Sequence, residues 1–323
     1  MCARLAAGSV IELCKEVAMN KLDSGIALIR PPGHHAQREK AKGYCIFNNI
    51  AIAVQELRRL KLAEKIMIVD WDIHHGNGIQ EVFLEDPDVL YFSIHRHENG
   101  GFYPCSPDAD TSVVGRNAGI GRNVNVAFER SGMNDGDYLH IFERLLLPMS
   151  KEFNPDFIIV ACGFDAAQGD PVGKCYVTPE CFSIMVTLVL NMANNGMGGR
   201  TAFVLEGGHD REASAYSALA CIKAMLWIPF EDGPIVPKAV QKIARDPSSS
   251  RESSLGVPKD QHNKPNVGPQ RPTDEPPKQE LTKVLERYSY LPFLEDYHAS
   301  KSGKAVVDRV ISYHRQYWKC LQS

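Results

Sequence analysis

Residues 68–78 (IVDWDIHHGNG) constrain the fold of this chain more than any other stretch. Residues 65–69, apolar from Ile66 onward, predict a short buried strand, and Asp70, Asp72 and His74 follow it at every second position. A strand-like backbone would point these three side chains to one side. Carboxylate oxygen and neutral imidazole nitrogen suit zinc, and a catalytic zinc needs three protein ligands and an open position. The stretch alone also permits a simpler interpretation, in which the acids cap the following helix.

Polar side chains follow other predicted strands as well. Because the carboxyl ends of parallel strands meet at one edge of a sheet, such exits are where ligands bind in open α/β folds. The predicted strands and the polar residues that follow them are 26–29 with His34 and His35, 89–94 with His95 and His97, 157–161 with Asp165, and 201–205 with Glu206 and His209. This convergence favours a functional site over the capping interpretation.

Helical patterns alternate with these strands. Apolar spacing predicts the helices 3–19, 50–60, 79–84, 137–149 and 178–192, and one more strand is expected at 124–128. Strands that alternate with helices imply right-handed crossovers and a mainly parallel sheet. The predicted fold class is therefore α/β, with helices on both faces of the sheet and the site at the carboxyl ends of the strands.

Composition limits the class of protein. The chain has 323 residues, 44% of them hydrophobic and 23% charged, which suits one large domain. A net charge of −3 gives no electrostatic case for nucleic acid. The nine cysteines include no C-x-x-C pair, and neither a leader nor a long apolar run is evident. We expect reduced thiols, a soluble intracellular protein, and no direct contact with nucleic acid or membrane.

The expected division of the chain has three parts. Residues 1–228 form the predicted domain, and the Pro- and Ser-rich residues 229–280 are expected to be a flexible linker. Residues 281–323 are expected to be a helical segment that docks on the domain, because 304–321 return to amphipathic spacing.

Taken together, the motifs resemble the zinc-dependent histone deacetylase family, class II. The similarity covers most of residues 3–228 and the last helix, and the segment GDPVGKCYVTPECF is most similar to the class IIb branch. It implies an arginase/deacetylase-like fold and hydrolysis of the acetyl-lysine amide in histone tails or other proteins. The segments that carry it are RPPGHHAQ, GYCIFNN, IVDWDIHHGNG, VLYFSIHR, EFNPDFIIVACGFDAAQGDP, VLEGG and HRQYWKCLQ.

The resemblance implies two metal sites. It makes Asp72, His74 and Asp165 the zinc ligands, which agrees with the argument from the strand ends. Zinc would polarise the acetyl carbonyl and lower the pKa of its water. Asp70 and Ser93, with nearby backbone carbonyls, match the family's structural potassium site.

The tandem histidines match the proton-transfer residues of the family. His35 corresponds to the general base and acid, and His34 to an electrostatic partner held by Asp70. Asn77 matches the residue that orients His35, where class I members have an aspartate. A neutral amide stabilises imidazolium less than a carboxylate does, so this exchange should affect the basicity of His35.

The resemblance also implies a substrate channel. Gly43, Tyr44 and Tyr103 match the narrow tunnel around the acyl-lysine stem, although phenylalanine is commoner at both tyrosine positions. Val172 matches the rim, where an apolar side chain offers nothing to hold a polyamine cation. Acetyl-polyamine cleavage by the same residues is therefore disfavoured.

Two departures bear on activity. VLEGG is followed by His209, where active members mostly carry tyrosine as the oxyanion donor, and histidine is the class IIa signature. Losing one such donor typically costs about 10²–10³ in rate, so weak deacetylation is expected. The chain also lacks the family's N-terminal segment, which predicts an N-terminally truncated catalytic domain.

An alternative function remains open from the sequence. The chain could be a catalytically weak or inactive corepressor scaffold that binds acyl-lysine, with the nucleus or the cytoplasm, or both, as its location. Six further histidines are expected to be packing or surface residues rather than ligands: His95, His97, His140, His262, His298 and His314.

Overall fold

A six-stranded, all-parallel sheet forms the centre of the molecule in the computed structural model, which describes residues 1–194, 200–226 and 298–322. The strand order is β1-β6-β5-β2-β3-β4. The strands are β1 (Ser24–Ala27), β2 (Ile66–Asp70), β3 (Val89–Arg96), β4 (Asn123–Phe128), β5 (Phe157–Cys162) and β6 (Thr201–Leu205). The predicted parallel α/β fold is confirmed.

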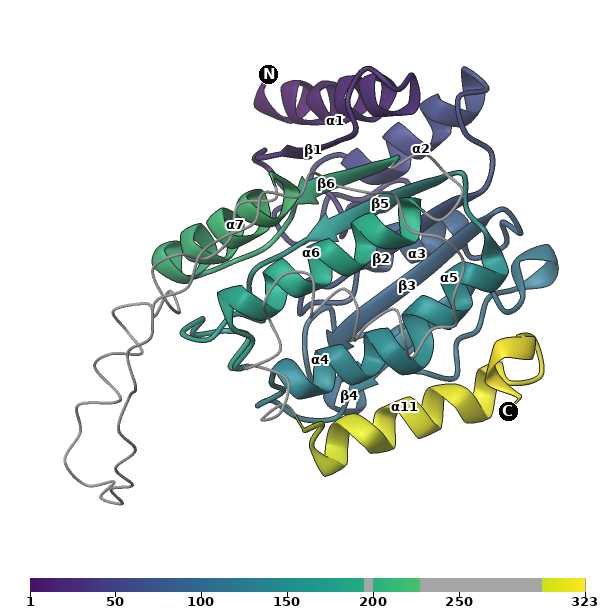
Figure 1. Ribbon diagram of the computed structural model, residues 1–323, viewed down its shortest axis with the longest axis vertical. Helices are drawn as coiled ribbons and strands as arrows, with labels where there is room; N and C mark the ends of the chain where they lie inside the picture. Colours follow the sequence, from purple (N-terminus) through teal and green to yellow (C-terminus); the bar gives the residue numbers. More distant parts are fainter. Residues whose placement is uncertain (195–199, 227–297, 323) are drawn as a thin grey trace, which may run out of the picture.

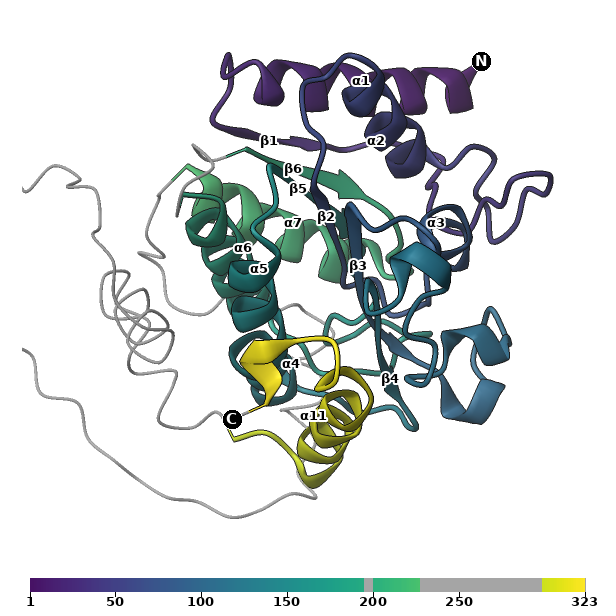
Figure 2. The same cartoon turned by 90° about the vertical axis from the view of Figure 1, so that its right-hand side faces the viewer.

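Helices cover both faces of this sheet (Figures 1 and 2). One face packs against α1 (Cys2–Ala18), α2 (Asn49–Arg59) and α3 (Asn77–Phe83). The opposite face carries α4 (Asp135–Ile141), α5 (Leu147–Phe153), α6 (Pro179–Asn194), α7 (Arg211–Met225) and α11 (Lys301–His314). Short 3-10 turns at Glu98–Gly100, Pro107–Ala109, Asn117–Gly119 and Lys319–Leu321 complete the described elements.

The strands are apolar on both sides because both faces of the sheet are buried. In β2, Ile66 and Ile68 pack with α1, α2 and α3, whereas Met67 and Val69 face the core of the other helices. The apolar run before Asp70 thus packs into the hydrophobic cores on both faces of the sheet, which holds the end of the strand in a fixed position.

Several element boundaries differ from the sequence prediction. The helix α7 was not predicted, because its apolar residues do not gather on one face; small residues such as Ala213, Ala220 and Ala224 are buried instead. The helix predicted at 137–149 is α4 and α5 joined by a π-turn, Phe142–Leu146. The C-terminal helix ends at His314 rather than near residue 321, and β1 lies two residues earlier than predicted.

The C-terminal helix α11 packs against β4 and α4. The predicted linker at 229–280 lies outside the described residues, so the predicted division of the chain stays a prediction. All nine cysteines fall within the described residues, and none forms a disulfide. In the part of the chain that the structure describes, no helix has the length and apolarity that a membrane crossing requires.

Candidate active site

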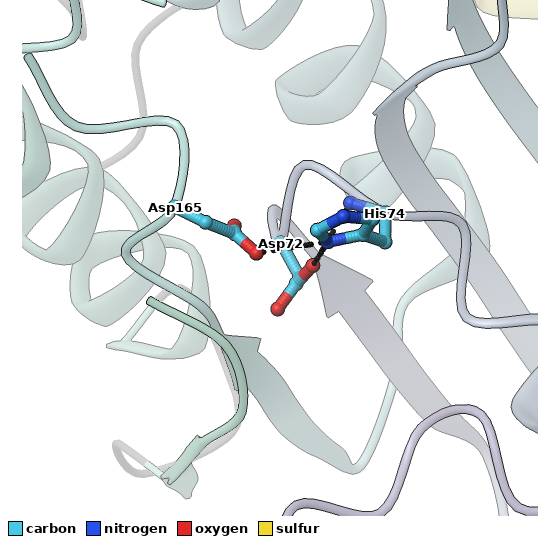
Figure 3. A group of neighbouring side chains, drawn as sticks. All are labelled: Asp72, His74 and Asp165. Carbon is cyan, nitrogen blue, oxygen red and sulfur yellow. Dashed lines mark hydrogen bonds and ion pairs between the residues drawn. The ribbon is translucent and has the colours of Figure 1, made fainter. Parts of the chain in front are cut away.

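Two neighbouring strands bring three metal-ligand side chains together. β2 and β5 pair in parallel with Asp70 opposite Ala161, so the chain leaves both strands at the same edge of the sheet. Asp72 and His74 follow β2, and Asp165 follows β5. The three side chains point toward one another and are buried (Figure 3).

The distances within this cluster are short. His74 Nδ1 lies 2.9 Å from Asp165 Oδ2 and 3.2 Å from Asp72 Oδ1. Backbone N–H groups fix the two carboxylates: Ile73 donates to Asp165 Oδ1 at 2.8 Å, and Gly207 donates to Asp72 Oδ2 at 2.7 Å. The His74 N–H also donates to Asp72 Oδ1 at 2.8 Å, so the backbone holds both oxygens of Asp72 and one oxygen of Asp165.

The electrostatics of the cluster favour a cation. Burial raises the pKa of Asp165 to about 6, and the nearby charge of Asp72 adds to the shift. Burial alone would lower the pKa of His74, but hydrogen bonds with Asp165 and Asp72 raise it to about 10. Two carboxylates buried this close together need a positive charge between them.

The donor set fits a zinc ion. One ligand atom from each of Asp72, His74 and Asp165 lies within 4.8 Å of the others, and two oxygens with one imidazole nitrogen match the ligands of catalytic zinc. The backbone around the carboxylates leaves no room for a side chain, since a Cβ on Gly207 would lie 2.5 Å from Asp72 Oδ2. A Cβ on Gly163 would also clash with the Asp72 carboxylate.

Two histidines lie beside this cluster. His34 and His35 follow β1, with ring centroids 4.0 Å apart. His34 Nδ1 lies 3.2 Å from Asp70 Oδ2, and His35 Nδ1 lies 2.9 Å from Asn77 Oδ1. Because an amide oxygen only accepts, the His35 Nδ1 must carry a proton, which leaves Nε2 as the basic atom.

The two imidazoles have opposite pKa shifts. Burial, together with the positive charge of His34, lowers the pKa of His35 well below its usual value. For His34, burial acts in the same direction but is outweighed by the charges of Asp72, Asp70 and Glu206, which raise its pKa well above the usual value. The pair thus combines one cationic and one neutral ring.

Aromatic side chains enclose the site. Phe102 stacks on His74 with ring centroids 5.0 Å apart and an interplanar angle of 12°. The Tyr103 ring meets the His35 ring edge-on at 5.0 Å. A Cβ on Gly43 would lie 2.9 Å from the Tyr103 hydroxyl, so this glycine also borders the site.

The remaining predicted channel residues lie farther out. Tyr44 is 86% exposed, and its side chain extends into solvent. Val172 is 38% exposed, and its carbonyl oxygen accepts a hydrogen bond from Arg96 Nη1. Their roles as tunnel wall and rim stay predictions.

His209 lies close to the metal-ligand cluster. Its Nδ1 is 4.0 Å from Asp165 Oδ2 and 3.6 Å from Asp170 Oδ2, and its ring centroid is 5.5 Å from that of His74. The hydrogen bond with Asp170, supported by the charges of Asp165 and Asp170, raises the pKa of His209. An acid therefore holds the ring at the position where the resemblance predicts a tyrosine.

Asp70 and Ser93 are register partners on β2 and β3, and both are fully buried. The Ser93 hydroxyl lies 2.8 Å from His95 Nδ1, while Asp70 interacts with His34. The potassium site predicted here stays a prediction.

Sequence reasoning assigned no role to four supporting residues, although it placed Glu206 at the end of a strand. Glu206 Oε2 accepts the N–H groups of Gly33 and His34, and Tyr91 donates its hydroxyl to Asp70 at 2.9 Å. Both lie inside motifs quoted above, VLEGG and VLYFSIHR, which could have identified them. The other two are Asp170, which accepts several backbone N–H groups, and Arg96, which stacks on Phe102.

Residues 1–225 match the family model described as Histone deacetylase domain. Histone deacetylase 5 of Arabidopsis thaliana is 48% identical over 227 residues, which cover 69% of this chain and 34% of that protein. Polyamine deacetylase HDAC10 of Homo sapiens is 44% identical, with 73% of this chain and 35% of that protein covered. The chain thus spans about a third of the length of these curated relatives.

A solved structure matches the whole fold. The crystal structure of the HDA15 HD domain superposes with a TM-score of 0.74 at 33% sequence identity, covering 99% of this chain and 69% of that chain.

Proposed function

This chain belongs to the histone deacetylase family, and we propose that it is a zinc-dependent protein-lysine deacetylase whose rate is limited by His209. One observation carries the proposal: the buried cluster of Asp72, His74 and Asp165 lies beside His34 and His35. The matched relatives are class II proteins; we assign the chain to this class, with class IIb character in most motifs and a class IIa histidine at 209.

Asp72, His74 and Asp165 would hold the zinc, in a site whose donor atoms suit that ion. When bound, zinc supplies a Lewis acid for the amide carbonyl and lowers the pKa of water to near 7.

The chain's own residues would move the proton. Asn77 holds the Nδ1 proton of His35, so that Nε2 can take a proton from the attacking water. The same Nε2 proton then passes to the amine nitrogen of the lysine leaving group. His34 stays cationic between Asp70 and Asp72 and offsets their negative charge beside the reacting atoms.

The channel supports an acyl-lysine stem as substrate. Gly43, Phe102 and Tyr103 border the cluster with apolar or aromatic surface, which suits the methylene chain of lysine. Val172 places no carboxylate at the rim, so a polyamine cation would lack a partner there. This favours acetylated proteins over acetylated polyamines, although a relative is named as a polyamine deacetylase.

Hydrolysis of an acetyl-lysine peptide by the zinc-loaded chain tests this proposal. We expect slow but measurable turnover that His35→Ala abolishes, because the variant loses the nitrogen that takes the proton from water. Turnover that persists in the His35→Ala variant, or stronger hydrolysis of acetylated polyamine than of peptide, would contradict the proposal.

A second candidate function is an acyl-lysine-binding corepressor scaffold. The observation that favours it is His209, which offers a ring held by Asp170 in place of a tyrosine hydroxyl. If the wild type and the His35→Ala variant bind the acetyl-lysine peptide with the same affinity, and neither releases acetate, the chain is such a scaffold.

A further inference from the structure

A second group of metal-ligand side chains lies at the same edge of the sheet. β3 and β4 pair in parallel with Arg96 opposite Phe128, so the next residues, His97 and Glu129, leave the sheet side by side. Asp110 reaches the same place from the loop after the 3-10 turn Pro107–Ala109. This second cluster is built on the same principle as the first, from the exits of neighbouring parallel strands.

The ligand atoms of the second cluster lie close enough together for one metal ion to contact all three. His97 Nδ1 lies 3.4 Å from Glu129 Oε1 and 3.9 Å from Asp110 Oδ2, and the three atoms lie within 4.8 Å of one another. Without a metal, the contact between His97 and Glu129 is a long hydrogen bond, since the usual N–H···O distance is about 2.9 Å. Two ligands at about 2.1 Å from a tetrahedral metal are separated by about 3.4 Å, which is close to what is seen.

Neighbouring groups hold the ligands in position. Ser112 N donates to Asp110 Oδ1 at 2.8 Å, and Asn99 N donates to Glu129 Oε2 at 2.5 Å, so the other oxygen of each acid turns to the cluster. The His97 side chain is only 6% exposed, and its Nε2 has no hydrogen-bond partner among the described residues. All polar contacts of that ring are therefore made through Nδ1.

A guanidinium group from α11 adjoins the second cluster. Arg309 Nη2 lies 3.1 Å from Glu129 Oε1 and also donates to the Ala127 carbonyl. The carboxylates of Asp110 and Glu129 are 34% and 30% exposed, which leaves a path for an ion from solvent. Arg309 is a cation already in place, and an incoming metal must compete with it for Glu129.

We propose that His97, Asp110 and Glu129 form a second site for a divalent transition-metal cation, distinct from the cluster at Asp72. Oxygen and imidazole ligands of this kind suit zinc and similar ions. A metal there would join the exits of β3 and β4 to the loop at Asp110 and displace the ion pair of Arg309.

The second site is linked to the channel wall. Phe102 N donates to the His97 carbonyl at 3.1 Å, and the Phe102 ring stacks on His74. A metal on His97 would fix the residues that carry Phe102 and Tyr103, so occupancy of the second site should make the channel wall more rigid.

Binding of Co²⁺ to the full chain, first stripped of metal by a chelator, tests the proposal without any measure of activity. We expect two Co²⁺ per chain by calorimetry, with a visible absorption band for each. Asp165→Asn should leave only the second site, and Glu129→Gln should leave only the first. Arg309→Ala should keep both and tighten the second about fivefold, the effect of removing a partly exposed ion pair.

Asp108→Asn is the matched control, since it removes a nearby carboxylate that is not a ligand. It should bind two ions with unchanged affinity. If Glu129→Gln does not fold, as judged by circular dichroism, Asp110→Asn gives the same test. A wild-type chain that binds one ion, or two ions retained by Glu129→Gln or Asp110→Asn, would overturn the proposal whatever the deacetylase assay shows.

Discussion

The two ligand clusters lie at one edge of the same sheet but differ in how deeply their carboxylates are buried and in which charged groups surround them. Asp72 and Asp165 have fully buried side chains, whereas Asp110 and Glu129 are about one third exposed. The first cluster borders two histidines, and the second borders the guanidinium of Arg309. A buried pair of carboxylates depends on a cation, while a partly hydrated pair can exchange one cation for another.

Removing one ligand from the buried cluster should have the largest effect. In Asp165→Asn the site loses a charged oxygen ligand, so we expect the zinc content to fall by about one ion per chain and deacetylation to fall on the order of 10³-fold. Metal analysis and peptide hydrolysis measure both. Asp108→Asn, which removes a carboxylate outside the buried cluster, should keep activity within about twofold. Equal losses in the two variants would show that the effect is not specific to the buried cluster.

The His209→Tyr variant adds a functional group beside the buried cluster instead of removing one. A tyrosine hydroxyl restores an oxyanion donor beside the buried cluster, and kcat should rise on the order of 10²-fold. Co²⁺ binding at the second cluster should not change. No gain in kcat, in a variant that still binds zinc, would show that His209 does not limit the rate.

Glu206 tests how far backbone positioning supports the buried site. Its carboxylate accepts the N–H groups of Gly33 and His34 at 2.7 and 3.0 Å, so Glu206→Ala would free the segment that carries both histidines. We expect kcat to fall about 10- to 100-fold with zinc content unchanged, as for other groups that orient catalytic side chains. Glu206→Gln keeps an acceptor oxygen and should recover most of the activity. Equal loss in Ala and Gln variants would require another role.

The smallest predicted effect concerns α11, which supplies Arg309 to the second cluster. Burial lowers the pKa of His314 to about 4, from an ordinary value of 6.5 for a histidine. The folded chain therefore binds fewer protons than the unfolded chain, and its stability is full above pH 6.5 and declines as the pH falls toward 4. At pH 5 the loss should be about 2 kcal/mol.

Chemical denaturation between pH 7.5 and 5 would measure this change in the free energy of unfolding. His314→Gln cannot take up the proton and should have a flatter pH profile. Parallel profiles for wild type and variant would exclude His314 as the cause.

The two clusters also differ in how well sequence predicts them. For the first cluster, one short motif marks both the strand and the ligands that follow it: an apolar run and then Asp70, Asp72 and His74. The parallel sheet predicted from the alternating strands and helices is present. His97, Asp110 and Glu129 belong to no common motif, so only the pairing of β3 with β4, and the loop that carries Asp110, bring them together. His97 was expected to be a packing or surface residue for that reason.

Some local features follow from packing rather than from pattern. The helix α7 buries small residues and lacks an apolar stripe, so periodicity gave no signal for it. Whether His209 turns toward or away from the cluster depends on Asp170, which is fixed by backbone N–H groups of Val172 and Gly173.

Gly163 and Gly207 lie so close to the buried carboxylates that any larger residue would displace a ligand. Neither glycine needs to touch a substrate to be indispensable. A saturation-mutagenesis library selected for zinc retention should therefore accept almost no substitution at these two positions. The exposed Tyr44 and Val172 should accept many substitutions in the same library. Variants of this sequence can therefore change the entrance of the channel while the metal-ligand cluster stays the same.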